Sequence, residues 1–320
     1  MNFTTIPFQN ITKFGQQTML DSPLFNISWI LGRFCNYKCS YCWPYANSST
    51  PDHQPLEVYK STVDEIKRQA RANGFNQFHW SFSGGEPTAY KHLLELVEHL
   101  GSEEYQSIHM TTNLSPSNNW WTKWANNTNT LQRRSLTASF HAEFANEIEF
   151  ADKILQLTSD GVFVTVNQVM VPNQFYSLYE RLQRFANKGI NVTLKPQSNE
   201  SASAVVDGYS PRMIELMQEG FPQRANGEEL YQIRLTDGET SYYLDQAERF
   251  NAFGFNKFTN WTCNAGYQSV IIRGNDVKRS YSCHDVPLGT LDSFELFKEP
   301  QRCITPSCVS SADSKIPKCK

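Results

Sequence analysis

Strand-like and helix-like segments alternate along much of this chain, and this alternation limits the folds open to it. The expected strands are residues 26–31, 78–82, 108–112, 136–140, 162–166 and 191–195, and the expected helices are 56–74, 90–100, 146–157 and 178–186. Such a pattern is typical of a parallel sheet with helices outside it. Six units are fewer than a closed eight-unit barrel needs. We therefore expect a partial, open barrel in an α/β protein.

Three of the eight cysteines lie within CNYKCSYC, residues 35–42, directly after the first expected strand. The N-terminus lacks a basic segment followed by an apolar one, and no apolar run reaches the length of a membrane span. We therefore expect a cytoplasmic protein, in which thiols are metal ligands or redox groups more often than disulfides. Zinc usually takes four ligands, often including His. Three close thiols without a neighbouring His favour a [4Fe–4S] cluster with one open iron, and three structural cysteines are the alternative.

A second motif, Gly84-Gly85-Glu86-Pro87, follows the second expected strand. Glycines allow close approach of the backbone, and a carboxylate can pair with an ammonium group. Alone, the motif also suits a plain turn before a helix.

Together the two motifs resemble the radical S-adenosylmethionine (SAM) superfamily, including the aromatic Tyr41 before the last cysteine. The resemblance implies that Cys35, Cys39 and Cys42 hold a [4Fe–4S] cluster whose open iron chelates SAM. It implies that Gly84, Gly85, Glu86 and Pro87 bind the amino group of SAM. One-electron reduction, from a donor such as flavodoxin or ferredoxin, then yields a 5′-deoxyadenosyl radical that abstracts hydrogen from the substrate.

Polar residues at the ends of the later expected strands are weaker candidates, because active sites in parallel βα folds gather at carboxyl strand ends. Each of them also suits a solvated loop. For contacts with SAM the candidates are Tyr41, Thr112, Asn113, Ser139, His141 and Gln168, and for catalysis they are Glu143 and Lys195. His79 alternates with aromatic residues inside an expected strand and is predicted to be structural.

Five further cysteines lie beyond residue 260, around a turn, a strand and another turn. This pattern resembles the SPASM and shorter twitch domains that follow many radical SAM cores, without the full SPASM motif. It implies one auxiliary [4Fe–4S] cluster, with Cys263, Cys283, Cys303 and Cys308 as ligands. Cys319 is then a bystander, a replacement ligand or a hydrogen donor to a substrate radical. A zinc site of Cys303 and Cys308 with His284 is the alternative.

The expected organisation is a partial (β/α)6 radical SAM barrel followed by a small cysteine-rich α+β domain of twitch or SPASM type. Its segments are an N-terminal extension (1–25), the core (26–197), a connecting region (198–250) and the auxiliary-cluster domain (251–320). Within this organisation, residues 231–235 and 240–244 flank Asp237-Gly238 and are predicted to form a hairpin.

The expected function is radical SAM catalysis on a C–H bond of a peptide or a small polar metabolite such as a sugar or aminocyclitol. Oxidation, cross-linking or epimerisation is the expected outcome. The formal net charge of −3, without a long run of one sign, disfavours nucleic acid as a partner. Two alternatives stay open: an enzyme that modifies tRNA or nucleosides, and a non-catalytic iron–sulfur protein for electron transfer.

Overall fold

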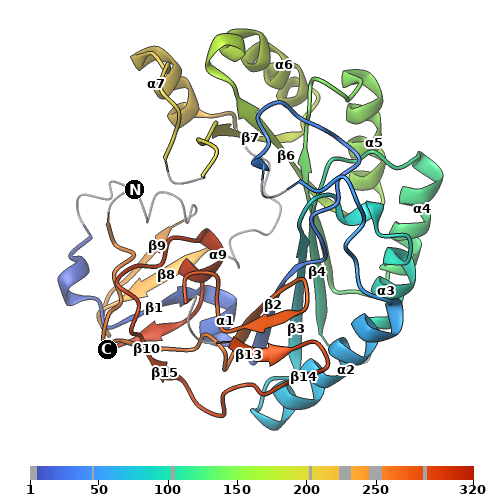
Figure 1. Cartoon of the computed structure of the whole chain (residues 1–320). Helices are drawn as coiled ribbons and strands as arrows, with labels where there is room; N and C mark the ends of the chain where they lie inside the picture. The colour runs from blue at the N-terminus through green and yellow to red at the C-terminus, as the bar shows by residue number, and fades with distance from the viewer. Residues whose placement is uncertain are drawn as a thin grey trace.

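Two sheets organise the computed structural model, which describes residues 6–44, 47–101, 105–201, 204–222, 232–244, 254–283 and 287–320 (Figure 1). The larger sheet has ten strands in the order β14-β13-β12-β11-β2-β3-β4-β5-β6-β7. These strands are β2 Leu24–Ile30, β3 Gln77–Ser83, β4 Gln106–Thr112, β5 Arg133–Ser139, β6 Phe163–Met170, β7 Asn191–Pro196, β11 Ser269–Arg273, β12 Asp276–Lys278, β13 Pro287–Thr290 and β14 Ser293–Phe294.

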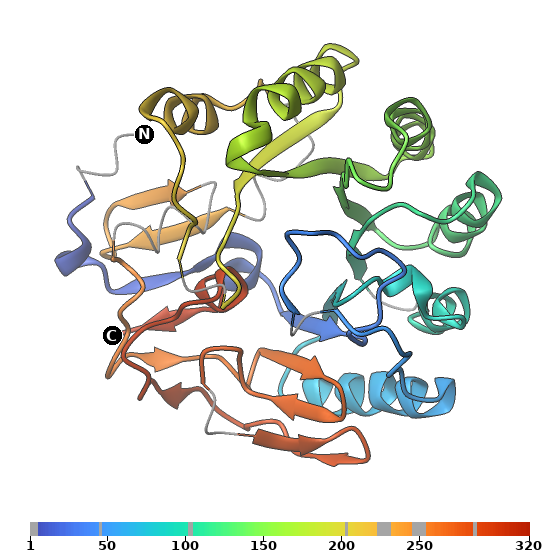
Figure 2. The same cartoon turned by 45° about the horizontal axis from the view of Figure 1, so that its top comes forward.

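The strands β2 to β7 pair in chain order, and every pair is parallel. The helices that connect them are α2 Leu56–Ala72, α3 Leu93–His99, α4 Asn118–Asn127, α5 Glu147–Ser159 and α6 Phe175–Asn187. All five lie on the same side of the sheet, where they form its outer layer (Figures 1 and 2). The edge strands β14 and β7 do not pair with each other in the described structure, so the barrel is open. The predicted partial (β/α)6 barrel is confirmed.

Aromatic side chains fill the layer between the sheet and its helices. Trp29, Trp80 and Trp124 are all fully buried there. Helix α4 was missed in the sequence because its segment is rich in Asn. It forms because Ser117 caps it by accepting a hydrogen bond from the Trp120 amide. The side chains of Trp121, Trp124 and Ala125 form the buried face of this helix.

The smaller sheet has six strands in the order β15-β10-β16-β1-β8-β9. They are β1 Lys13–Gln16, β8 Ile233–Thr236, β9 Ser241–Leu244, β10 Thr262–Cys263, β15 Gln301–Arg302 and β16 Lys318–Cys319. The predicted hairpin corresponds to the antiparallel pair β8–β9, and Tyr231 at its start lies outside the described residues. This sheet combines strands from three of the segments expected in the sequence.

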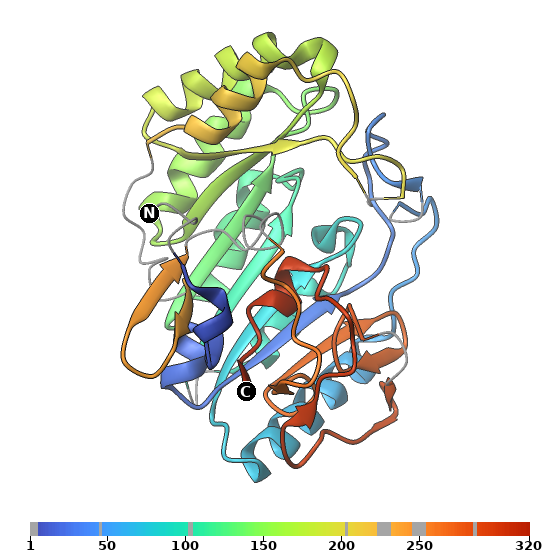
Figure 3. The ribbon, with the colours of Figure 1, turned by 90° about the vertical axis from the view of Figure 1, so that its left-hand side faces the viewer.

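Residues near the C-terminus also enlarge the main sheet. Strand β11 pairs in parallel with β2, and β12 to β14 continue the sheet as an antiparallel meander. The other α-helices among the described residues are α1 Gln17–Asp21, α7 Pro211–Glu219 and the short α9 Ser311–Ser314. Helix α9 lies between the two sheets, on the side of the main sheet away from α2 to α6 (Figures 1 and 3). Among the described residues, no helix is both long and apolar enough to cross a membrane.

Candidate functional site

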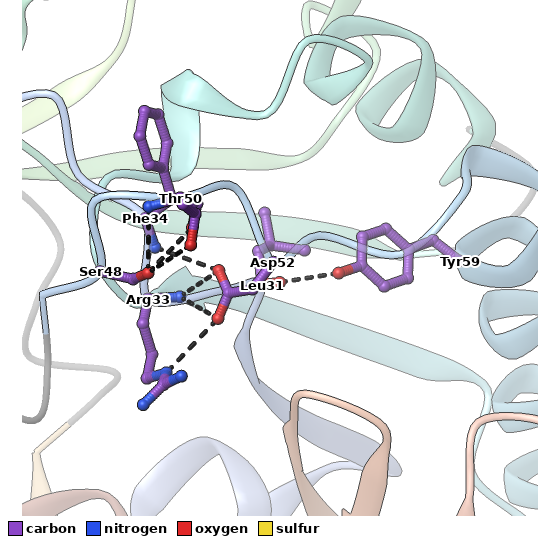
Figure 4. Close-up of polar contacts among 7 residues, drawn as sticks. All are labelled: Leu31, Arg33, Phe34, Ser48, Thr50, Asp52 and Tyr59. Carbon is purple, nitrogen blue, oxygen red and sulfur yellow. Dashed lines mark hydrogen bonds and ion pairs between the residues drawn. The ribbon is translucent and has the colours of Figure 1, made fainter.

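The segment with the three close cysteines leaves the end of β2 and returns beside its own start. The Cys35 amide donates to the Ser48 carbonyl, and the Ser48 amide donates to the Arg33 carbonyl. The Asp52 carboxylate accepts hydrogen bonds from the Arg33 and Phe34 amides at 2.8 and 3.1 Å (Figure 4). Asp52 therefore closes the base of a loop, residues 31–52, that we call the cysteine loop. Asp52 could not be found from the sequence, because its hydrogen-bond partners in this contact are backbone groups.

The two glycines after β3 fit tightly against this loop. The Gly85 amide donates to the Gly32 carbonyl at 2.9 Å, and the Glu86 amide donates to the Phe34 carbonyl at 2.8 Å. A Cβ on Gly84 would lie 2.3 Å from the Gly32 oxygen, and one on Gly85 would lie 2.2 Å from the Phe34 oxygen. The close approach expected of these glycines is thus an approach to the cysteine loop's own backbone.

Glu86 is buried, and four protein donors surround its carboxylate. One oxygen accepts from the Thr88 amide at 3.0 Å, the Thr88 hydroxyl at 2.6 Å and the Thr112 hydroxyl at 2.7 Å. The other oxygen accepts from the Asn113 amide at 2.6 Å. Burial raises the pKa of Glu86, while these hydrogen bonds oppose the rise. In this structure Glu86 joins the end of β3 to the end of β4.

The end of β4 also reaches into the cysteine loop. The Asn113 side-chain amide donates to the Asn36 side chain at 2.9 Å, and Asn36 in turn donates to the Ser115 hydroxyl at 2.9 Å. Asn36 lies directly after Cys35, so this contact fixes the first cysteine's neighbour. Of this pair only Asn113 was a candidate in the sequence.

The end of β5 holds the other half of the loop. The Tyr41 hydroxyl lies 2.8 Å from His141 Nδ1, and the Glu143 carboxylate accepts from the Ser40 amide and hydroxyl. Tyr37 stacks on Phe144 with ring centroids 4.8 Å apart. His141 and Glu143 therefore contact residues between the cysteines, which is a positioning arrangement. Burial lowers the pKa of His141 to about 4, so its ring is neutral at pH 7.

The three thiols of the cysteine loop are free, and none of them is fully buried. Burial raises the pKa of Cys35, Cys39 and Cys42, in the case of Cys39 to about 12 with Glu143 adding to the effect. Among the described residues, no three His, Cys, Asp or Glu side chains already stand as a metal site. A bound cluster would supply the positive charge that three thiolates need, so the donor set fits one.

The remaining candidates of the core occupy two different faces of the main sheet. Ser139 and Lys195 lie on its inward face, away from the helices, and Ser139 is in register with Asn167 of β6. Gln168 lies on the helix side and is almost completely buried. Its amide nitrogen donates to the Val169 carbonyl, while its oxygen has no partner among the described residues. Asn167, which is in register with Ser139, lies on the same inward face.

Four of the late cysteines gather at the smaller sheet. Cys263, Cys283, Cys303 and Cys308 are all buried. Their thiols are close enough to act on one another: Cys263 and Cys283 raise the pKa of Cys303, and Cys263 and Cys303 raise that of Cys308, after the larger effect of burial. Lys318, buried beside them, lowers the pKa of both Cys303 and Cys308.

Cys319 lies apart from these four thiols. In β16 the register places Lys318 opposite Cys263, and Cys319 opposite Thr262. Side chains alternate along a strand, so Cys319 lies on the other face from Cys263. It is exposed. His284, the nitrogen ligand of the alternative zinc site, lies outside the described residues.

Comparison with known proteins finds a similarity to one family in the first part of the core. Residues 29–127 match the model of a family described as the Radical SAM superfamily. A curated protein of Saccharolobus solfataricus, described as a probable GTP 3′,8-cyclase, is 30% identical over 103 residues. That match covers 32% of this chain and 30% of the relative, so the chain spans about a third of that protein's length.

Solved structures share the fold over a longer stretch. Native anSMEcpe with bound AdoMet is similar with a TM-score of 0.52 and 15% identity, over 85% of this chain and 79% of that one. The same protein with AdoMet and the Kp18Cys peptide is similar to the same degree, over 78% of its chain. At this identity the likeness shows the fold alone.

Proposed function

We propose that this chain, whose residues 29–127 match the Radical SAM superfamily model, is an enzyme that cleaves SAM reductively at a [4Fe–4S] cluster. The resulting 5′-deoxyadenosyl radical would abstract hydrogen from a C–H bond of the substrate. Cys35, Cys39 and Cys42 would hold the cluster. The chain's own contribution is to fix the loop that carries these thiols and to keep the site in one geometry.

One observation carries this proposal: three consecutive strand ends hold the cysteine loop. Gly85 and Glu86 after β3 bond to its base, Asn113 after β4 bonds to Asn36, and the β5 end bonds to Ser40 and Tyr41. These contacts are made to residues just before Cys35 or between the cysteines, and none of them uses a thiol. A merely structural group of cysteines gives no reason for such support.

The four late thiols support the proposal of an auxiliary cluster held by Cys263, Cys283, Cys303 and Cys308. They come from separate segments, are buried together, and have the Lys318 cation beside them. Buried thiolates need positive charge nearby, which iron and Lys318 would supply. Such a cluster would bind substrate or accept an electron from a product radical. We therefore favour oxidation, cross-linking or epimerisation of a peptide or small polar metabolite.

A nucleotide substrate is the second candidate. The relative from Saccharolobus solfataricus is described as acting on GTP, and its match to this chain is 30% identical. The matched stretch is about a third of either chain, which supports shared core chemistry more than a shared substrate.

The test is anaerobic. Protein reconstituted with iron and sulfide is reduced with dithionite in the presence of SAM, and 5′-deoxyadenosine is quantified by chromatography. We expect formation of 5′-deoxyadenosine by the wild type and none by Cys39→Ala, with Cys319→Ala as the matched control that keeps activity. A wild type with a complete cluster and no product would leave the electron-transfer alternative in place.

A further inference from the structure

The main sheet has two faces of opposite chemistry. Along β3, β5 and β6 buried and partly exposed residues alternate strictly near the centre of the sheet. The buried positions, such as Trp80, Leu136 and Val166, face the helices. Parallel sheets usually have two covered faces and strands that are apolar throughout. The inward face of this sheet departs from that rule.

Strand register arranges the inward residues in rows across the sheet. One row runs through Ser28, Ser81, His109 and Ser135, and a second runs through Thr111, Thr137 and Thr165. Hydroxyl groups from neighbouring strands therefore lie side by side, because residues in register share a face. These rows lie below the carboxyl strand ends that hold the cysteine loop.

Part of this face is a fixed hydrogen-bond network. His109 contacts the Ser135 hydroxyl through Nδ1 at 2.9 Å and the Thr137 hydroxyl through Nε2 at 3.2 Å. His79 contacts the Ser107 hydroxyl at 2.8 Å. Burial lowers the pKa of His79 to about 3 and that of His109 to about 4, so both rings are neutral at pH 7.

Other hydroxyls on this face remain available. Ser28, Ser81, Thr111 and Thr165 are partly exposed, and within the described residues no side-chain hydrogen bond is formed by any of them. A hydroxyl both donates and accepts, so a row of them matches a ligand that does the same. A bound ligand that covered these hydroxyls without hydrogen-bonding to them would lose binding free energy, because it would desolvate them.

The charged residues on this face disfavour a cationic ligand. No inward position of β2 to β7 or of β11 holds Asp or Glu, whereas Arg133, Lys195 and Arg273 occupy such positions. The acidic groups in or beside the cysteine loop, Asp52, Glu86 and Glu143, already accept backbone amides. An ammonium group on a substrate would thus meet no carboxylate on these strands.

Resting on the proposed function, we propose that the inward face binds a polyhydroxylated small molecule without a cationic group, and that Ser81 and Thr111 contact its hydroxyls. A cyclic polyol is the simplest example. Among the small metabolites considered above, this selects a sugar-like compound over an aminocyclitol, and it disfavours a peptide with apolar side chains.

The test compares two six-membered rings that differ in charge. Saturation-transfer NMR and calorimetry measure the binding of myo-inositol and of 2-deoxystreptamine to the reconstituted, unreduced protein with SAM present. We expect myo-inositol to bind at least ten-fold more tightly than 2-deoxystreptamine. Ser81→Ala and Thr111→Val should each weaken myo-inositol binding about five-fold, the loss of one hydrogen bond. Thr122→Val on the outer helix α4 is the matched control and should change nothing.

The outcomes separate this inference from the proposed function. Equal or tighter binding of 2-deoxystreptamine, absence of myo-inositol binding, or equal effects of Thr111→Val and Thr122→Val would overturn the inference. So would exclusive binding of a test peptide. Formation of 5′-deoxyadenosine by the same preparation is measured separately, so a protein that cleaves SAM but ignores the polyol refutes only the inference.

Discussion

Glu143 holds Ser40 through both its backbone and its side chain: the carboxylate lies 3.0 Å from the Ser40 amide nitrogen and 2.6 Å from the Ser40 hydroxyl. Ser40 stands between the cysteines at 39 and 42, whereas Glu143 follows β5. A residue 103 positions away thus fixes the centre of the cysteine loop.

The first prediction concerns this contact. Glu143→Gln keeps the size of the side chain but removes the charge that strengthens its hydrogen bonds. Both partners are exposed, so we expect a cost of about 1 kcal/mol. Iron affinity should fall about five-fold, and the electron paramagnetic resonance lines of the reduced core cluster should broaden or shift.

Iron titration under limiting iron measures the first effect, and spectra of the loaded protein measure the second. Glu98→Gln, an exposed glutamate on α3, is the matched control. Identical spectra and iron affinity for Glu143→Gln and wild type would show that the contact does not position the loop.

The second prediction concerns Gly85. Its added Cβ would lie 2.2 Å from the Phe34 oxygen and 2.4 Å from the Arg33 oxygen, both of them backbone atoms. Gly85→Ala must therefore displace the cysteine loop, at a cost of about 3 kcal/mol. Gly74→Ala is the comparison: nothing lies within 4 Å of its Cβ, although its φ of +89° disfavours alanine. It should cost only about 1 kcal/mol. Urea unfolding measures both, and equal costs would refute the clash.

The contacts of Gly85 show what the sequence could and could not predict. The βα units and the two motifs were visible because strand and helix periodicities are local and the motif spacings are short. A close backbone approach at Gly85 was predicted, but its partner was not. That partner is the backbone at Phe34, 51 residues earlier in the sequence. A strand between Cys263 and Cys283 was expected, but its parallel pairing with β2, from beyond residue 260, was not, because that pairing is non-local. Asp52 was missed since it contacts main-chain amides, which carry no signature in a sequence.

The third prediction tests the auxiliary cluster. In a Cys35/Cys39/Cys42→Ala background the remaining iron reports on the late cysteines alone. We expect this variant to keep about half the wild-type iron and sulfide. Adding Cys308→Ala should remove most of what is left, whereas adding Cys319→Ala should remove none. Loss of iron on adding Cys319→Ala would show that Cys319 is a ligand. Loss of all iron from the folded triple variant would refute the auxiliary cluster.

The fourth prediction concerns Lys318. Its ammonium group is buried, donates to the Asp313 and Ile316 carbonyls, and acts on Cys303 and Cys308. A nearby cation favours the more negative, reduced state of a cluster. Lys318→Met should therefore make the auxiliary cluster harder to reduce, by tens of millivolts as an order of magnitude, about 1 kcal/mol. A redox titration of the triple cysteine variant measures this, and an unchanged potential would contradict it. Lys320→Met, which alters an exposed neighbour, is the control.

The last prediction follows from the inward histidines. Burial lowers the pKa of His79 to about 3 and that of His109 to about 4, against an ordinary value near 6.5. The unfolded chain therefore takes up protons first as the pH falls. The stability that these rings contribute is complete above pH 6.5 and is lost progressively down to about pH 4 for His109 and about pH 3 for His79. Between these pKa values, each histidine should add about 1.4 kcal/mol per pH unit to the slope of the free energy of unfolding against pH.

Urea unfolding at pH 7.5, 6.5, 5.5 and 4.5 measures that slope. His109→Gln should reduce it by about 1.4 kcal/mol per pH unit, the contribution of one proton. Thr122→Val on α4, which changes no titratable group, is the control and should leave the slope unchanged. If His109→Gln leaves the slope unchanged, the His109 ring is not held neutral on the inward face. The hydrogen bonds of His109 to Ser135 and Thr137 would then not support the proposed polyol site.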